Sequence, residues 1–227
     1  MARIDQDNDI SRHRPCTSSE TEKRMLSALD ESGGRDVRVL WSLGAFYSRA
    51  GHYDQATACM QRIAELIEDP ERQAACFLAL GQIEEQKGDY RSAAMRYQSG
   101  IALEPQGRRT VYFLRNNLGY CLNEMREHEA AVPHLEQALK IDPTRANAYK
   151  NLALSHQASG NLGRAAELFV AATRANAADP RSLHHLESLI QANPDLLVDM
   201  PGLQQDLEGC RYAVEEVRRQ MPSLRGH

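Results

Sequence analysis

The feature that most constrains this chain is an internal repeat in which small residues recur at a fixed distance from one another. A leucine followed by a small residue occurs four times, at Leu43-Gly44, Leu80-Gly81, Leu118-Gly119 and Leu152-Ala153. Twelve residues after each small residue stands an alanine, at Ala56, Ala93, Ala131 and Ala165. Self-similarity of this kind is typical of proteins built from stacked structural repeats.

Each copy also contains a turn signal and ends in an acidic residue followed by proline. The turn positions are Gly51, Gly88, Arg126 and Gly160. The acid-proline dipeptides are Asp69-Pro70, Glu104-Pro105, Asp142-Pro143 and Asp179-Pro180. Glycine tolerates the positive φ of a tight turn, and proline cannot continue a helix. We therefore interpret each copy as a helix, a turn and a second helix, separated from the next copy by the proline.

The repeated columns also predict how the two helices of a copy pack. The small residues allow the helices to approach closely, and large residues in the flanking columns fill the space around that contact. The large residues four positions after each alanine are Met60, Tyr97, Leu135 and Phe169. One hairpin cannot bury its apolar face alone, so the pattern predicts a stack that forms a continuous core.

These motifs resemble the tetratricopeptide repeat family over residues 37–180. The resemblance implies an all-α fold, a right-handed α-α superhelix of four helical hairpins at about 37–70, 74–107, 112–145 and 146–179. The copies are spaced by 37, 38 and 34 residues, against about 34 residues in the family. Because the extra residues lie near 71–73 and 106–109, either the linkers are longer there or the adjoining helices gain part of a turn.

The repeats are flanked by segments of a different character. Residues 1–18 have few large apolar side chains and are predicted to be a disordered tail. Residues 19–36 predict an N-terminal helix that ends at Gly33-Gly34. Residues 181–222 predict a degenerate half-repeat and then a last helix, from about Leu203 to Gln220, whose apolar side caps the stack. Weak self-association through this last helix is the alternative.

Composition argues against several classes of function. The net charge of −4 and the pI of about 6.1 do not favour nucleic-acid binding, which needs a basic surface. No apolar run approaches the roughly 20 residues that span a bilayer, and the first residues do not form a secretory signal. We therefore expect a cytoplasmic protein without membrane insertion. The five cysteines are widely spread, which favours reduced thiols over disulfides or zinc ligands.

Catalytic and metal-binding motifs are absent from the sequence. There is no Gly-rich phosphate loop, no HExxH and no GxSxG. His128-Glu129 begins like a metal motif, but His134 follows two positions too late to share one helical turn with His128. We therefore expect no enzyme activity, no catalytic residue, no cofactor and no metal.

The family resemblance also implies a binding surface, because in tetratricopeptide repeats the first helices of successive hairpins line a concave groove. The register assigns to this groove Trp41, Arg49, Leu78, Gln82, Phe113, Asn116, Asn117, Tyr120, Asn123, Asn147, Lys150 and Asn151. Asn117 and Asn151 share one column, and such a ladder of asparagines is suited to hydrogen-bonding the backbone of an extended peptide. The alternative is that these asparagines brace the neighbouring helix.

Trp41 is the one tryptophan of the chain, and two roles are open to it. Exposed aromatic side chains are frequent anchors for a binding partner. Of the two roles, however, we expect Trp41 to be buried against the N-terminal helix through Met25 or Leu29.

The sequence thus predicts an adaptor or scaffold for protein–protein interaction that binds a peptide or partner segment in the groove. A chaperone-like assembly or secretion factor that shields a client segment is the alternative, and a regulatory subunit of an enzyme is a third hypothesis. The groove columns lack the cations with which some family members grip the C-terminal carboxylate of heat-shock chaperones. That clamp function is therefore not expected.

Overall fold

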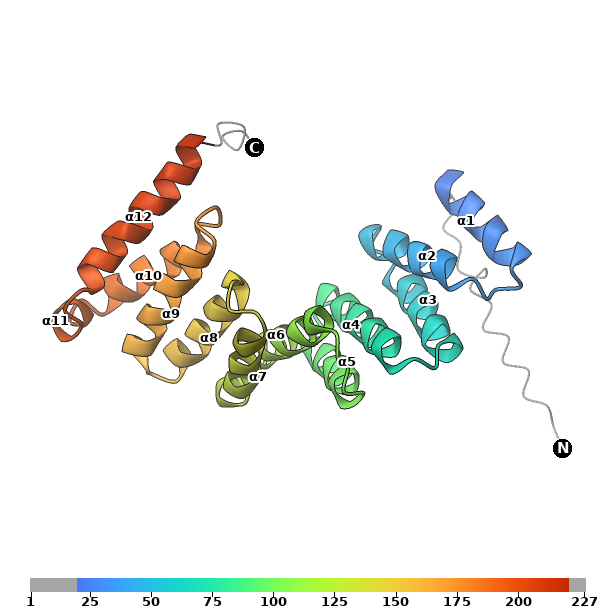
Figure 1. Ribbon diagram of the computed structural model, residues 1–227, viewed down its shortest axis with the longest axis horizontal. Helices are drawn as coiled ribbons and strands as arrows, with labels where there is room; N and C mark the ends of the chain where they lie inside the picture. The colour runs from blue at the N-terminus through green and yellow to red at the C-terminus, as the bar shows by residue number, and fades with distance from the viewer. Residues whose placement is uncertain (1–19, 221–227) are drawn as a thin grey trace. The chain divides into compact units, whose positions relative to one another are not determined.

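The computed structural model describes residues 20–220, and these residues form helices and no strand (Figure 1). The helices are α1 (Glu20–Glu31), α2 (Val37–Arg49), α3 (Tyr53–Leu66), α4 (Pro70–Gln86), α5 (Tyr90–Ala102), α6 (Arg108–Glu124), α7 (His128–Ile141), α8 (Ala146–Ala158), α9 (Leu162–Ala175), α10 (Arg181–Ala192), α11 (Leu196–Asp199) and α12 (Leu203–Gln220). The chain divides into two compact units, Met1–Pro105 and Gln106–His227. The tail predicted for residues 1–18 lies outside the described residues.

The first unit contains the hairpins α2/α3 and α4/α5, with α1 packed against α2. Its core is built from fully buried side chains such as Leu40, Leu43 and Ile63. Helix α1 is attached by Leu26 and Leu29, which join this core. A buried hydrogen bond of 2.9 Å from the Tyr47 hydroxyl to Glu22 adds a polar tie, so α1 is an integral part of the first unit.

The second unit contains the hairpins α6/α7 and α8/α9, followed by α10, α11 and α12. Fully buried side chains from successive helices form its core, among them Leu118, Leu135, Phe169 and Leu186. In this unit, as in the first, the two helices of each hairpin pack directly against each other. The all-α solenoid of helical hairpins expected from the repeats is confirmed.

Close approach within a hairpin is visible at the Leu-Gly column. A methyl group on Gly81 would lie 2.3 Å from the Tyr97 ring, and one on Gly119 would lie 2.5 Å from Leu135 Cγ. Both distances are far below van der Waals contact, so a side chain does not fit there without rearrangement. The small column of the sequence therefore faces its large column, as predicted.

The turns inside the hairpins have the backbone conformation that the glycines suggested. Gly51, Gly88 and Gly160 have φ values of 76°, 78° and 79°. Arg126 occupies the equivalent position in the third hairpin with φ 63°. The four hairpins thus share the same turn geometry, even where the turn residue is not glycine.

The acid-proline dipeptides do not all act in the same way. Asp69 and Pro70 belong to the start of α4, because the Asp69 carboxylate accepts the Arg72 N–H at 2.8 Å and Pro70 is in the first turn. A proline in the first turn costs no hydrogen bond, since that N–H has no helical partner. The dipeptide therefore lies between α3 and α4 and also starts α4.

The extra residues between repeats lengthen helices. Helices α4 and α6 each have 17 residues, whereas α2 and α8 each have 13. The difference is about one helical turn. The second and third hairpins therefore begin near 70 and 108, about one turn earlier than the 74 and 112 expected, and of the two alternatives the longer helix is the correct one.

The last helix covers the end of the second unit. Leu203, Leu207, Cys210 and Val214 of α12 are at most 4% exposed, and α12 contacts α9 and α10 (Figure 1). Ion pairs from Arg174 to Asp206 and from Arg211 to Glu187 lie at its margins. The apolar side of α12 is therefore covered by the chain's own helices.

Two further observations concern the whole described region. Within residues 20–220, no helix combines the length and the apolar content that crossing a bilayer requires. Cys59, Cys76, Cys121 and Cys210 are buried free thiols, and burial raises the pKa of Cys59 to about 12. Cys16 lies outside the described residues.

Candidate protein-binding site

The predicted groove residues of the first unit lie on α2 and α4. Trp41 is 39% exposed and stands outside the core cluster that contains Met25 and Leu29. The expected burial of Trp41 was therefore wrong. The reason is geometric: Leu40, Leu43 and Tyr47 form the buried side of α2, and Trp41 is displaced from Leu40 by about 100° around the helix.

The other predicted residues of this surface differ in exposure. Arg49 and Gln82 are exposed, and Leu78 is half-buried. The Arg49 side chain folds back, and its Nε donates to the Ala45 carbonyl at 3.2 Å. Helices α2 and α4 are joined at their C-terminal ends by a hydrogen bond of 2.9 Å from the Ser48 hydroxyl to Gln86. We call Trp41, Arg49, Leu78 and Gln82 the first-unit face.

In the second unit, the predicted asparagines bond to one another. Asn116 on α6 and Asn151 on α8 are each 5% exposed. The Asn151 Nδ2 donates to Asn116 Oδ1 at 3.2 Å, and the Asn116 Nδ2 donates to Asn117 Oδ1 at 3.0 Å. These amide groups therefore join α6 to α8, which is the bracing alternative raised by the sequence.

Asn123 extends this brace toward the C-terminal ends of the same helices. Its Nδ2 donates to the Asn151 carbonyl at 2.8 Å, and its Oδ1 accepts the Ser155 hydroxyl at 2.8 Å. The ring of His128 lies 3.1 Å from the same Oδ1. Sequence reasoning missed Ser155, which is fully buried, because nothing in its neighbours shows that it faces α6.

Four predicted residues of the second unit lie outside the brace. Phe113, Tyr120 and Lys150 are half-buried, and Asn147 is exposed. Burial, followed by the charge of Arg181, lowers the pKa of Lys150, while Asp179 opposes this effect. Among the described residues, no carboxylate forms an ion pair with Lys150, and Asp179 is held instead by the Arg181 guanidinium at 2.6 Å.

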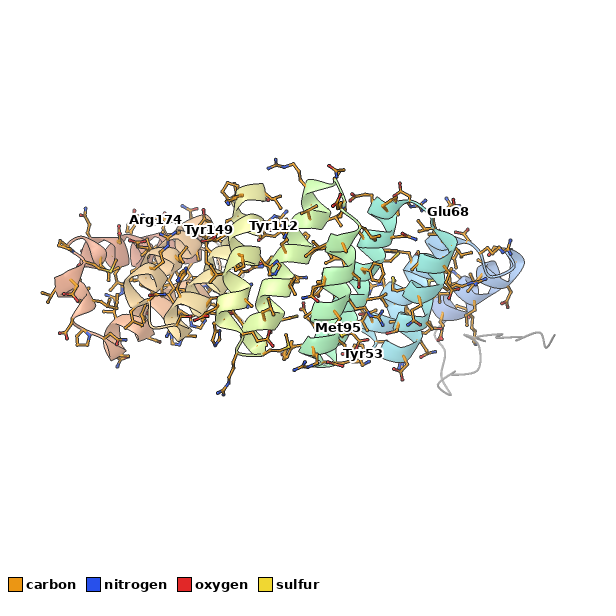
Figure 2. All side chains as sticks on the ribbon, turned by 90° about the horizontal axis from the view of Figure 1, so that it is seen from below. Tyr53, Glu68, Met95, Tyr112, Tyr149 and Arg174 are labelled. Atoms are coloured by element: carbon orange, nitrogen blue, oxygen red, sulfur yellow. The ribbon has the colours of Figure 1, made fainter. Side chains whose placement is uncertain are left out.

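A pocket of about 270 Å³ opens at the start of α8. Its lining residues are Tyr112, Phe113, Thr144, Arg145, Ala146, Asn147, Ala175 and Asn176. They come from the start of α6, the start of α8 and the end of α9. Figure 2 labels Tyr112 of this pocket, together with Tyr149 of α8 and Arg174 of α9 in the same unit. The sequence pointed to Phe113 and Asn147 but not to their convergence on one pocket.

Arg145 is the central charged group of this pocket. Its guanidinium carbon lies 4.9 Å from the centre of the Tyr112 ring and 5.0 Å from that of Phe113. Its Nε donates to Asp142 at 2.6 Å. Hydrogen bonds from Thr144 and then from Arg145 lower the pKa of Asp142. Arg109 stands 5.8 Å from the Phe113 ring, so two guanidinium groups flank the aromatic pair.

The described residues show no metal centre. In the range 20–220, no three residues of the metal-binding types His, Cys, Asp and Glu gather where an ion would fit. His128 and His134 of α7 have separate surroundings: His128 bonds to Asn123, and His134 Nδ1 is buried without a hydrogen-bond partner among the described residues. Burial and the charge of Arg115 lower the pKa of His134.

Several solved structures have a similar fold. BtubC (BKLC) from P. vanneervenii matches with a TM-score of 0.70 at 17% identity, over 92% of this chain and 94% of that chain. MamA from Desulfovibrio magneticus RS-1, residues 41 to the end, gives 0.61 at 18% identity, over 84% and 97%. YrrB, described as a TPR protein with an unusual peptide-binding site, gives 0.59 at 16% identity, over 86% and 97%. At these identities the likeness shows the fold alone.

A sequence relative and two family models match parts of the chain. Protein NPG1 of Arabidopsis thaliana is 25% identical over 162 residues, which are 69% of this chain and 22% of that protein, so the chain spans about a fifth of its relative's length. Tetratricopeptide repeat models match residues 36–104 and 122–190, together more than half of the chain. The repeats and their fold typically form non-catalytic modules for protein interaction. The chain belongs to the tetratricopeptide repeat family.

Proposed function

We propose that the protein is an interaction scaffold in which each unit binds an extended segment of a partner protein along the first helices of its own hairpins. The observation that carries this proposal is Trp41. This large aromatic side chain on α2 is 39% exposed, and the contact of its apolar surface with water is unfavourable. A partner side chain packed against it would recover that free energy, which is why tryptophans are frequent anchors of interfaces.

The position of Trp41 distinguishes it from the other exposed apolar side chains. Among residues 20–220, the large exposed apolar residues are Trp41, Met95, Val198 and Tyr212. Only Trp41 lies on the first helix of a hairpin, since Met95 is on the second helix of its hairpin and the other two lie beyond the repeats. The exposed anchor is thus on the helix that the family register assigns to the groove.

The second unit supports the proposal with a different chemistry. Phe113, Asn147 and Lys150 leave polar and aromatic groups accessible or half-accessible on α6 and α8. Asn116 and Asn151 hold the two helices in register, so their proposed role is to shape this surface. The polar groups of this second-unit surface favour an interaction scaffold over a chaperone-like factor that shields a uniformly apolar client.

The proposed location is the cytoplasm. Four thiols remain free and buried in the described region. Free cysteines of this kind fit a reducing compartment, where disulfides are rare.

Peptides selected from a random phage-displayed library on the full chain test this function. For peptides that bind the first unit, we expect Trp41→Ala to lower the affinity about tenfold, which is the effect of losing a modest hot spot. Met95→Ala is the matched control, because it removes an exposed apolar side chain from the same unit but from α5. Affinity is measured by fluorescence anisotropy.

Two outcomes contradict the proposal. One is a library from which no peptide binds the chain. The other is a set of binders for which Met95→Ala is at least as damaging as Trp41→Ala.

A further inference from the structure

The pocket at the start of α8 presents hydrogen-bond donors that the described residues leave without an anion. Helix α8 begins after Arg145, which gives no side-chain cap, so the N–H groups at its start lack the carboxylate that caps other helices of the chain. In the first unit, by contrast, Asp36, Asp69 and Asp89 place a carboxylate oxygen at the start of α2, α4 and α5. An anion is favoured at such a position by the N–H groups and by the helix dipole.

A buried hydroxyl gives an independent sign of a missing acceptor. Tyr112, which lines the pocket, is 2% exposed; the Ala148 N–H of α8 approaches its hydroxyl oxygen, but no described residue accepts the hydroxyl proton. Burial raises the pKa of Tyr112 to about 12, and the nearby charge of Arg145 and backbone of Ala148 act in the opposite direction. The hydroxyl is therefore a protonated donor at the first turn of α8, and buried donors without an acceptor are uncommon.

Arg145 supplies the charge of the pocket. Its Nε is occupied by Asp142, and no described residue takes a hydrogen bond from its two terminal nitrogens. Its cation–π contacts with Tyr112 and Phe113 hold the guanidinium beside the two rings. A planar guanidinium held in this way is suited to a carboxylate.

The neighbouring charges continue this preference along α8. Lys150 lies one turn beyond Asn147 and is half-buried, and no residue in the range 20–220 forms an ion pair with it. The two acidic residues near these cations, Asp142 and Asp179, are each already bound by an arginine. A half-buried ammonium without a counter-ion is costly, and an acidic group on a ligand removes that cost.

We propose that the second unit recognises an acidic segment of a partner protein. One carboxylate of the segment occupies the pocket between Arg145 and the start of α8, and a second lies one helical turn away at Lys150. The inference rests on the proposed function and names the chemistry of its partner. A carboxylate is favoured over a phosphate because Asp142 neutralises part of the charge of Arg145, which leaves the pocket suited to a single negative charge.

Peptides selected from a random library on the full wild-type chain test this inference. We expect the pool to be enriched in Asp and Glu. Arg145→Gln is expected to weaken the acidic binders about tenfold or more, as for loss of a charged hydrogen bond, and Lys150→Gln to weaken them several-fold. Lys140→Gln is the matched control, because it changes the charge of the unit equally but lies exposed on α7.

A second set of peptides locates the contact. In the binders, each acidic residue is replaced by its amide, Asp by Asn and Glu by Gln. Replacing the acidic residue that occupies the pocket should weaken binding of the peptide to the wild-type chain. The same replacement should cause no further loss of affinity for the Arg145→Gln variant. Because Arg145 also packs on two aromatic rings, circular dichroism confirms folding of this variant, and Lys150→Gln provides the same test without that packing.

The outcomes distinguish the acidic partner from the proposed scaffold function. Peptides that bind tightly but show no acidic enrichment overturn the acidic partner and leave the scaffold function standing. The same holds if Lys140→Gln weakens the acidic binders as much as Arg145→Gln does. A library without any binder overturns both.

Discussion

Asn151 is held inside the second unit through both its side chain and its backbone. Its amide donates to Asn116, and its carbonyl accepts from Asn123 and Ser155. All three partners are bonded to further groups, so the side chains form a connected network between α6 and α8. Buried networks in which every member is bonded rigidify the helices that they join.

Replacing Asn151 by alanine should therefore lower the free energy of unfolding. Removal of its amide leaves the Asn116 Oδ1 without this donor in a buried site, at a cost of about 1–3 kcal/mol. Asn147→Ala, one turn earlier on the exposed side of the same helix, should change stability by less than about 0.5 kcal/mol. Urea unfolding of both variants measures the difference. Equal stability of the two variants would show that the brace contributes nothing.

Single side chains were also where the sequence was least informative. The repeat register placed Trp41 on a first helix, but the exposure of Trp41 depends on how α1 packs against α2. Likewise, Arg145 follows an acid-proline dipeptide, and nothing in the sequence around it indicates its cation–π contact with Tyr112, 33 residues earlier. Such contacts join helices that are distant in sequence, and a single sequence does not encode them in any spacing.

The hairpin is the element that the sequence predicts best, because each of its features has a local cause. The Leu-Gly column, the alanine column and the turn residue lie within a short stretch, and each is needed for close packing or for reversal of the chain. Helix lengths were harder to predict. Residues near 71–73 and 106–109 suit a helix or a linker equally well, and stacking against the neighbouring hairpin decides between them.

Close packing within the third hairpin predicts a strong effect at Gly119. A methyl group there would meet Leu135 at 2.5 Å, so Gly119→Ala should destabilise the chain by about 1–3 kcal/mol through overpacking. A methyl group on Gly209 of α12 would have no atom within 4 Å. Gly209→Ala should instead stabilise by up to about 1 kcal/mol, because alanine is the better helix former. Chemical denaturation of the two variants checks this opposite sign.

The turn of the same hairpin predicts a stabilising change. Arg126 adopts φ 63°, a conformation that costs a residue with a side chain about 1 kcal/mol relative to glycine. Arg126→Gly should therefore raise the free energy of unfolding by about that amount. The reverse change, Gly88→Arg in the second hairpin, should lower it. Thermal and urea unfolding that gave both changes the same sign would contradict this explanation of the turn.

At the scale of the whole molecule, three partly buried histidines predict how stability depends on pH. Burial is the largest cause that lowers the pKa of His134, His156 and His185. The unfolded chain binds protons at these residues near pH 6.5, whereas the folded chain binds them only at lower pH. Because the unfolded state then holds more protons, stability rises with pH.

The full chain should accordingly be less stable at about pH 5.5 than at about pH 7.5. The contribution of these histidines is complete above the unfolded pKa and is lost as the pH falls toward the folded values. Carboxylates with lowered pKa, such as Asp142 and Asp179, lose their contribution only near and below about pH 4. Urea unfolding at several pH values tests this, and a flat profile through the histidine range would contradict it.

Photo-crosslinking is the most direct test of whether partner segments bind the first helices of the hairpins. A peptide selected on the full chain is made with a photoreactive residue, and the crosslinked positions are mapped by mass spectrometry. A peptide that binds the first unit is expected to crosslink to α2 or α4, near Trp41, and one that binds the second unit to α6 or α8, near Arg145. Crosslinks confined to the second helices α3, α5, α7 and α9 would contradict it.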